Sequence, residues 1–429
     1  MFKKYISIFT LAFLAQACFA QNIDKLINQG EVERIERTLS ADDMQGRKTF
    51  TPGIDKAAEF IAAEFKKAGI QPLKDNSWFQ EFFMLKTKFE SAKGELNGQS
   101  LNERDIVGLT SKEELSVTQS SGYEYVKIGK GENLYEKVMA MVETSKNYFV
   151  TVDTSFGRMF NSLKRFRQNA FPSDANILLV LSNETAATTY NISFKQTVTK
   201  DPLKNVVGVL PGKKKKDEYV IFSGHYDHLG IGKPNAEGDS IYNGANDDAA
   251  GITAVIMLAK YFAEKKDNAR TLVFAAFTAE EIGGFGSQYF SKQFDPAKVM
   301  AMFNIEMIGT DSKWGTNSAY ITGYEKTDMG KILEKNLEGS AFKFYPDPYP
   351  DQQLFYRSDN ATLARLGVPA HTISTSKMDS EKHYHTLGDE IETLDLKNMT
   401  EIIKAIAISS ASIVAGKDTP ARVDAKQLR

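Results

Sequence analysis

Cysteine is nearly absent from this chain, which contains a single one, Cys18, among 429 residues. Disulfide frameworks and zinc sites made of cysteines are therefore excluded. The chain also has little surplus charge, with a formal net charge of −2. That balance argues against nucleic acid or an anionic membrane as the main partner.

Size and composition are those of a soluble globular protein. Hydrophobic residues make up 42% and charged residues 25%, enough for a substantial core. A chain of 429 residues exceeds the usual size of one domain. We therefore expect one large domain with an insertion, or two domains.

The first twenty residues have the layout of a secretory signal peptide. Lys3 and Lys4 form a basic start, a short apolar run follows, and "CFA" precedes Gln21. The run is too short for a permanent membrane span. Cleavage after Ala20 would remove Cys18, and with it all thiol chemistry, and would place the mature protein in the periplasm or outside the cell. Anchoring through a lipid-modified Cys18 is the alternative, although Ala15 stands where such signals usually have leucine.

Three parts follow the signal peptide. Residues 21–84 contain two amphipathic helical patterns, at 23–40 and 54–69, separated by the glycine-punctuated loop "MQGRKTFTPG". Residues 85–200 alternate short strand-like pieces with polar stretches and predict an inserted small α+β lid or subdomain. Residues 201–429 form the third part, in which apolar strands alternate with helices.

The alternation after residue 201 predicts an α/β fold. Its strand patterns, "DEYVIFSG", "ARTLVFAAFT" and "KVMAMFNIEM", are almost continuously apolar, as buried strands are. We expect a mixed, largely parallel sheet sandwiched by helices. Binding sites in such sheets lie beyond the carboxyl ends of the strands.

Polar residues follow each of these strands at that expected edge. The chain has five histidines, all in this part. The candidates are, in chain order, His225, Asp227, Asp247, Asp248, Glu280, Glu281, Glu306, His383, His385 and Asp389.

This set of side chains favours a divalent metal. Histidines and several carboxylates at one sheet edge would repel and desolvate one another without a cation, and imidazole with carboxylate suits zinc. The surplus of acids suggests an open catalytic site. A pair of metals bridged by one carboxylate is one form that such a site can take. At a strand end, adjacent side chains point in different directions. One of Glu280 and Glu281 can therefore bind metal while the other acts as a base on water.

The ordered motifs "GHYDH", "NGANDDAAG", "AEEIG", "NIEMIG", "SDN" before "LGVPA" and "YHTLGD" resemble a known family. The chain is similar to the co-catalytic zinc aminopeptidases, which include exported bacterial leucyl-type aminopeptidases, glutamate carboxypeptidase and the transferrin receptor. The resemblance covers about 202–390 and the segment before residue 85. Only about 85–200, where many members carry a protease-associated insert, lacks a clear match.

The resemblance implies a role for each candidate residue. Asp247 would bridge two divalent metals, most often Zn²⁺. His225 and Glu306 would complete one metal site, and Glu281 and His385 the other. Glu280 would be the general base, Asp227 would orient His225, and Tyr384 would donate to the oxyanion. Three further residues would orient neighbouring groups or cap a local turn rather than bind metal: His228, His383 and Asp389. The peptide bond between Asp247 and Asp248 would be cis.

Two residues depart from the family pattern. Glu306 stands where many relatives have aspartate, and Asn360 where many have histidine in a loop near the substrate pocket. The implied function is hydrolysis of N-terminal residues from peptides. A carboxypeptidase or dipeptidase on the same core, a single-zinc glutaminyl cyclase and a receptor-like relative are the alternatives. A full ligand set disfavours the receptor, and "FTAEE" disfavours the cyclase.

Overall fold

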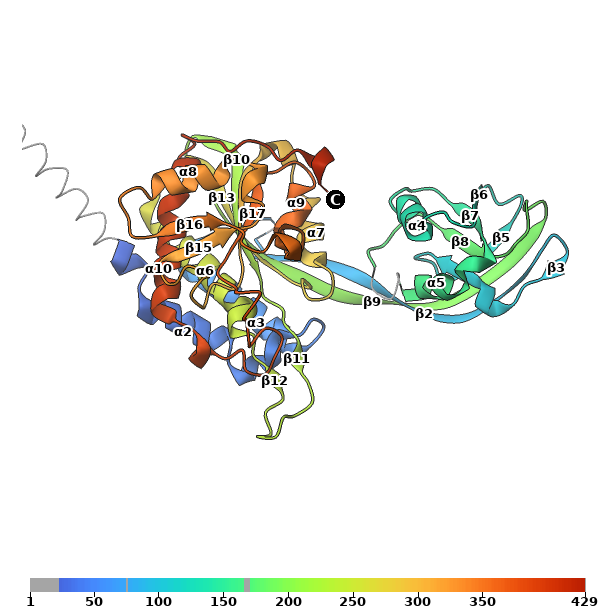
Figure 1. Ribbon diagram of the computed structural model, residues 1–429, viewed down its shortest axis with the longest axis horizontal. Helices are drawn as coiled ribbons and strands as arrows, with labels where there is room; N and C mark the ends of the chain where they lie inside the picture. Colours follow the sequence, from blue (N-terminus) through green and yellow to red (C-terminus); the bar gives the residue numbers. More distant parts are fainter. Residues whose placement is uncertain (1–22, 75, 166–169, 429) are drawn as a thin grey trace, which may run out of the picture. The chain divides into compact units, whose positions relative to one another are not determined.

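The computed structural model describes residues 23–74, 76–165 and 170–428. The chain divides into two compact units, one formed by residues up to Glu81 and from Leu203 onward, the other by Phe82–Pro202. The second unit is close to the predicted insert at 85–200. Figure 1 follows the chain through both units. The predicted signal peptide at 1–20 lies outside the described residues.

Helices and strands of the first unit alternate after residue 203. Its helices are α2 (Gln29–Leu39), α3 (Pro52–Lys67), α6 (Ala250–Lys265), α7 (Phe285–Ser291), α8 (Met329–Asn336), α9 (Asn360–Ala364), α10 (Leu396–Ser409) and α11 (Ala411–Val414). Its strands are β1 (Gln71–Pro72), β10 (Lys215–His225), β11 (Gly230–Ile231), β12 (Ile241–Tyr242), β13 (Arg270–Phe277), β14 (Val299–Ile305), β15 (Ser318–Ile321), β16 (Lys343–Pro346) and β17 (Ala370–Ser374). Strands β2 (Phe79–Leu96) and β9 (Tyr190–Leu210) contain the boundaries between the units.

The central sheet of the first unit has the order β16-β15-β17-β14-β10-β13-β9-β2. Strand β10 pairs in parallel with β13 and β14, and β14 pairs in parallel with β17. Strand β9 is antiparallel to β13, and β15 is antiparallel to β17. The sheet is therefore mixed and largely parallel, as the sequence predicted.

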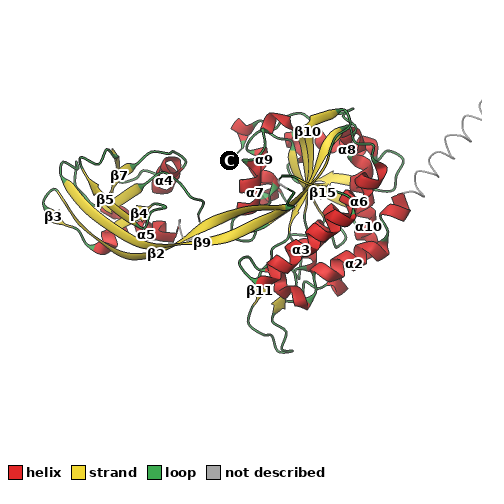
Figure 2. Ribbon diagram, turned by 180° about the vertical axis from the view of Figure 1, so that it is seen from behind, coloured by secondary structure: helices red, strands yellow, loops and turns green. Residues whose placement is uncertain are grey.

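Alternate residues of the strands face two separate cores. Val220 and Phe222 of β10 belong to a cluster with apolar residues of α2, α3, α6 and α10. Ile221, between them, belongs to a second cluster with residues of α7 and α9. Figure 2 shows these two groups of helices on opposite sides of the sheet. Burial on both faces explains why the strands are apolar at nearly every position.

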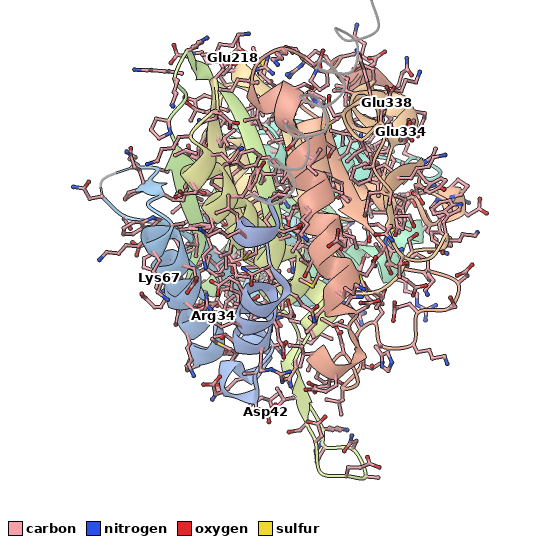
Figure 3. The ribbon with its side chains drawn as sticks, turned by 90° about the vertical axis from the view of Figure 1, so that its left-hand side faces the viewer. Arg34, Asp42, Lys67, Glu218, Glu334 and Glu338 are labelled. Atoms are coloured by element: carbon pink, nitrogen blue, oxygen red, sulfur yellow. The ribbon has the colours of Figure 1, made fainter. Side chains whose placement is uncertain are left out.

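A buried carboxylate joins three helices on one side of this sheet. Glu64 of α3 has a fully buried side chain that pairs with Arg34 of α2, with Lys67 and with Lys260 of α6, each at 2.7 Å. Figure 3 shows Arg34 and Lys67 on the side of the unit formed by α2 and α3. The three cations compensate the charge that burial of Glu64 alone would leave unpaired.

The second unit has its own two cores. Its other elements are β3 (Gln99–Ser100), β4 (Ile106–Leu109), β5 (Glu114–Thr118), β6 (Glu124–Ile128), α4 (Leu134–Val142), β7 (Tyr148–Val152), α5 (Gly157–Ser162) and β8 (Ile177–Leu181). The sheet β4-β8-β7-β6 packs on one face against α4 and α5. On its other face it packs against residues of β2, β5 and β9. The predicted α+β character agrees with this arrangement.

Two helices are shorter than their sequence patterns predict. The pattern at 23–40 is interrupted at Asn28, whose side chain accepts a hydrogen bond from the Glu31 amide and so starts α2 as an N-cap. The sequence also predicts a helix over residues 396–415, and the structure divides this segment at Ser410 into α10 and α11. Among the described residues, no helix combines the length and the apolar character needed to cross a membrane.

Candidate metal centre

Three parallel strands deliver the predicted side chains to one edge of the sheet. Strand β10 ends at His225, which lies in register with Phe277 at the end of β13. Glu280 follows β13 after two residues, and Glu306 directly follows β14. Parallel pairing therefore brings together residues that are far apart in the sequence.

The loop before α6 holds Asp247 by its backbone. Residues Ala245–Ala249 form a wide helical turn, and the peptide bond between Asp247 and Asp248 is cis, as the resemblance implied. The amides of Asn246 and Asp247 donate to the carboxylate of Asp389 at 2.8 and 3.0 Å. Asp389 thus orients this loop, the role expected from the sequence.

Asp247 lies between two histidines. His225 Nε2 is 3.1 Å from Asp247 Oδ1, and His385 Nε2 is 3.2 Å from Asp247 Oδ2. Burial works to raise the pKa of Asp247, but the hydrogen bonds from the two imidazoles outweigh it and lower that pKa. The same Asp247 contact, joined by Glu281, raises the pKa of His385 to about 10. Each carboxylate oxygen of Asp247 therefore faces a different histidine.

Glu281 belongs to the same cluster and has two histidine partners. Its Oε2 is 3.2 Å from His385 Nε2, and its Oε1 is 2.8 Å from His228 Nδ1. Burial works to raise the pKa of Glu281, but these two contacts lower it to about 2. His228 is buried and its Nε2 has no hydrogen-bond partner. The sequence placed His228 outside the ligand set, and the structure places it directly against a predicted ligand.

The carboxylate of Asp227 lies closer to the backbone amides of the paired glutamates than to the ring of His225. Its carboxylate accepts hydrogen bonds from the amides of Glu280 and Glu281 at 3.0 and 3.3 Å. His225 Nδ1 is 3.1 Å from the Asp227 carbonyl oxygen but 3.8 Å from its carboxylate. Asp227 therefore orients His225 mainly through its main chain, and its carboxylate fixes the turn after β13.

Glu280 and Glu306 complete an acid-rich wall. Burial raises the pKa of Glu280 well above its ordinary value, and the neighbouring carboxylates of Glu306 and Asp359 raise it further. Burial also raises the pKa of Glu306 to about 7. Ser358 Oγ donates to Glu306 Oε2. Both carboxylate oxygens of Asp359 are buried without a hydrogen-bond partner.

The backbone is strained at three positions next to these side chains. Ala279 precedes Glu280 with φ +59°, Met307 follows Glu306 with φ +52°, and His385 itself has φ +56°. Residues other than glycine rarely adopt this left-handed conformation, and active sites are enriched in residues that do.

Arg47 is a buried residue of the glycine-punctuated loop "MQGRKTFTPG" and is not among the residues predicted for the centre. Its guanidinium donates to the carbonyl oxygens of Tyr226, Leu39, Asn243 and Gly244 at 2.6–3.0 Å. Tyr226 lies between His225 and Asp227, and Gly244 begins the turn that carries Asp247. Arg47 therefore ties together the two loops of the centre. This role could not be predicted from the sequence without knowing that Arg47 is buried.

A pocket opens in front of the acid-rich wall. It is lined by Asp247, Glu280, Glu281, Glu306, Met307, Tyr320, Thr322, Leu354, Arg357, Ser358, Thr372, Ser374, Ser376, Met378, Tyr384 and His385. The Tyr384 ring stacks on His385 with centroids 3.9 Å apart, and burial raises the pKa of its phenol to about 12. Asn360 does not line this pocket; it is buried and hydrogen-bonds to Phe355, Ala370 and Thr372.

The arrangement fits a divalent metal. Ligand atoms of His228, Asp247, Glu281 and His385 lie within 4.8 Å of one another. His225 contacts the other oxygen of Asp247, away from the His385 contact. Imidazole nitrogens and carboxylate oxygens are typical zinc ligands, and a cation would compensate the buried acids. His383 does not belong to this group.

Comparison with protein families identifies the part of the chain that carries the centre. Residues 205–409 match the model described as peptidase family M28. This match covers a little less than half of the chain, and within it the segment is similar to peptidase family M28. The predicted family and enzyme class, a metal-dependent peptidase, are confirmed at the level of this domain.

Curated relatives in fungi match parts of the chain. A "probable zinc metalloprotease" of Pyrenophora teres is 38% identical over 109 residues, 25% of this chain and 23% of that protein. A "probable leucine aminopeptidase" of Trichophyton verrucosum is 28% identical over 209 residues, 47% of this chain and 54% of that protein. The chain thus spans about a quarter and about half of these relatives' lengths.

Solved structures share the fold over nearly the whole chain. An aminopeptidase from Aneurinibacillus superposes with a TM-score of 0.54 at 16% identity, covering 95% of this chain and 98% of that one. A glutaminyl cyclase of Porphyromonas gingivalis has a TM-score of 0.51 at 11% identity, covering 91% and 99%. At these identities the likeness shows the fold alone.

Proposed function

We propose that this protein is a metal-dependent aminopeptidase that removes N-terminal residues from peptides through a carboxylate-bridged pair of zinc ions. The observation that carries this proposal is Asp247, whose two oxygens each face a different histidine. His225 and Glu306 would hold one ion, and Glu281 and His385 the other. The name of the Trichophyton relative supports the same activity.

The residues of the chain would divide the chemistry of hydrolysis. The ions, when bound, polarise the scissile carbonyl and make water more acidic. Glu280 accepts the proton of the attacking water and transfers it to the leaving amine. The phenol of Tyr384 donates a hydrogen bond to the developing oxyanion. The Asp227 carboxylate accepts hydrogen bonds from the amides of Glu280 and Glu281. It thereby fixes the backbone from which the side chains of the base and the ligand point in different directions.

We also propose that the protein is exported, with a mature chain that begins near Gln21. The basic and apolar layout of residues 1–20 supports this proposal. Intact-mass analysis of the exported protein should give the mass of the chain from Gln21, without cysteine. A retained, acylated Cys18 would show lipid anchoring instead.

A panel of peptides tests the proposed activity. It contains peptides with a free N-terminus, N-blocked peptides, peptides with a free carboxyl terminus and an N-terminal glutaminyl peptide, each assayed after chelation and after return of zinc. We expect zinc-dependent loss of the N-terminal residue only from free-amine peptides. Hydrolysis of N-blocked peptides would indicate a carboxypeptidase, and cyclisation without hydrolysis would indicate a glutaminyl cyclase.

A further inference from the structure

The pocket in front of the metal centre has walls of opposite chemical character. One side carries the carboxylates of Asp247, Glu280, Glu281 and Glu306. The rest is lined by hydroxyl-bearing residues, two methionines, a leucine and Arg357. Among these lining residues Arg357 is the single arginine or lysine. Its place in the pocket calls for a physical explanation.

The guanidinium of Arg357 is almost unused by the protein. It donates one hydrogen bond, from Nη1 to Oε1 of Gln352 at 3.3 Å, between two exposed side chains. Within the part of the chain that the structure describes, it forms no ion pair, although four carboxylates line the same pocket. A guanidinium has five N–H donors, so most of those of Arg357 remain available.

The backbone fixes Arg357 close to the reaction centre. Its amide donates to the carbonyl of Leu354 at 3.0 Å, closing the short turn Leu354–Tyr356. The next residue is Ser358, which hydrogen-bonds to Glu306. Arg357 is therefore one residue away from a direct contact with a predicted metal ligand, and it lines the pocket.

We propose that Arg357 binds a carboxylate of the substrate and makes the enzyme selective for peptides that carry one near the scissile bond. This inference rests on the proposed function. The carboxylate is either the free terminus of a dipeptide, three bonds from the scissile carbonyl, or the side chain of an acidic N-terminal residue. A planar guanidinium matches carboxylate geometry in both cases. The acid-rich wall would repel such an anion unless Arg357 offset it.

Four substrates and three variants test the inference. The first pair is a dipeptide and its C-terminal amide, which differ only in the terminal carboxylate. The second pair is glutamyl-alanine amide and glutaminyl-alanine amide, which differ only in the side-chain charge. Arg357→Gln, Arg357→Lys and a control, Arg365→Gln, are compared with the wild type. Arg365 is exposed and does not line the pocket.

We expect Arg357→Gln to raise KM roughly 5- to 10-fold for one carboxylate-bearing member of a pair, with kcat nearly unchanged. KM for its uncharged partner should change less than about 2-fold, and Arg357→Lys should restore part of the difference because it keeps the charge. The pair that responds identifies the carboxylate. Equal effects on both members of each pair, or the same effect from Arg365→Gln, would overturn the inference.

A binding measurement separates this inference from the proposed function. Calorimetry with zinc-loaded Glu280→Gln protein measures the affinity of the same four peptides without turnover. Loss of a carboxylate preference on adding Arg357→Gln supports the role of Arg357 even if the wild type hydrolyses none of them. No carboxylate preference in either protein refutes it even if the wild type is an active aminopeptidase.

Discussion

Glu280 and Glu281 are adjacent in the chain, yet only Glu281 contacts the two histidines His228 and His385. If Glu280 is the base, Glu280→Gln should keep the metal content and lower kcat by ~10²–10⁴-fold, because an amide cannot accept the proton of water. Glu281→Gln should lower metal content and activity together, since it removes a ligand. Metal analysis and steady-state kinetics on the same preparations measure both effects.

The opposite result would exchange the two roles. Loss of a metal ion from Glu280→Gln with retention by Glu281→Gln would make Glu280 the ligand. Near-normal peptidase activity of Glu280→Gln would refute the proposed hydrolytic mechanism.

His228 contacts Glu281, and we expect this contact to increase the metal affinity of the site. Its Nδ1 contact fixes one oxygen of Glu281 and leaves the other toward His385. Partners of this kind typically change metal affinity by about 10–100-fold. We expect His228→Ala to weaken zinc binding within that range in a competition with a chromogenic chelator.

His383→Ala is the matched control for His228→Ala. His383 is a histidine of the same region and stands outside the cluster of ligand atoms. Zinc affinity of His383→Ala should equal that of the wild type. Equal affinities for wild type and His228→Ala would show that Glu281 needs no such support.

Much of the centre could be predicted from residue types at strand ends, because His225, Glu281 and Glu306 follow apolar runs that parallel pairing aligns. Arg47 could not be predicted in this way. It lies in a polar loop about 180 positions before His225, and burial of a charge in such a loop depends on tertiary contacts. The Asp227 carboxylate also turned out to bind backbone amides more closely than His225, a distinction of less than 1 Å that no pattern encodes.

At the scale of elements, Arg47 connects loops that carry metal ligands. Arg47→Gln would leave at least two buried carbonyl oxygens without a donor, because glutamine has two amide hydrogens for four acceptors. Each unsatisfied buried group costs about 1–3 kcal/mol. We expect a loss of at least about 2 kcal/mol in the free energy of unfolding, measured by urea denaturation in the presence of a chelator.

Arg37→Gln provides the control for Arg47→Gln. Arg37 also forms ion pairs, with Glu33 and Glu392, but its side chain is 55% exposed. Ion pairs between exposed side chains contribute little to stability, so Arg37→Gln should unfold at nearly the same urea concentration as the wild type. A comparable loss in both variants would contradict the role assigned to the buried guanidinium.

The ion-pair cluster around Glu64 predicts a pH dependence for the packing of α2, α3 and α6. Burial works to raise the pKa of Glu64, but its bonds with Lys260, Lys67 and Arg34 hold the pKa below its ordinary value of 4.5. The hydrogen bond from Arg34 is the main cause that lowers the pKa of Glu31, in the same cluster, to about 2. A depressed pKa stabilises the fold above the unfolded-state value and loses that contribution as the pH falls.

We therefore expect the stability advantage of the wild type over Glu64→Gln to be constant above about pH 5.5. It should shrink as the pH falls below about 4.5, the ordinary pKa of the group, because Glu64 then takes up a proton more readily in the unfolded chain than in the folded one. Urea denaturation of both proteins at a series of pH values, in a chelating buffer, measures the difference. An advantage that grows as the pH falls would contradict the assignment.

The strands with long apolar runs were predicted well. Helices were predicted less well where a local side chain determines the residue at which the helix begins. Strands β10, β13 and β14 coincide closely with their sequence patterns. Asn28 interrupts the first helical pattern because its side chain binds the Glu31 amide, an alternative to continuing the helix. Periodicity alone does not weigh that local competition.

At the scale of the whole molecule, the two units have separate hydrophobic cores. The two main clusters of the first unit contain no residue of 82–202, and those of the second unit contain none outside it, among the residues the structure describes. We therefore expect that a variant in which an Asn-Gly turn joins Glu81 to Leu203 keeps the fold of the first unit.

Circular dichroism and cooperative urea unfolding of this shortened variant test its fold, and zinc affinity tests the metal centre. We expect zinc affinity within about 3-fold of the full chain, because every residue assigned to the centre lies in the first unit. An insoluble or non-cooperative product would show that the first unit needs residues 82–202 to fold.

The two boundaries lie side by side within the first unit. Val207 donates its amide to the Trp78 carbonyl at 2.7 Å, and Asn205 Nδ2 donates to Gln80 Oε1 at 2.8 Å. Residues 82–202 connect these two hydrogen-bonded segments, as the loop of a hairpin connects its two strands. Loop-closure entropy grows only with the logarithm of length, by about 0.6 kcal/mol for each doubling. Once residues 82–202 fold around their own cores, they are no longer a random coil. The loop-closure entropy lost when β2 pairs with β9 is then smaller.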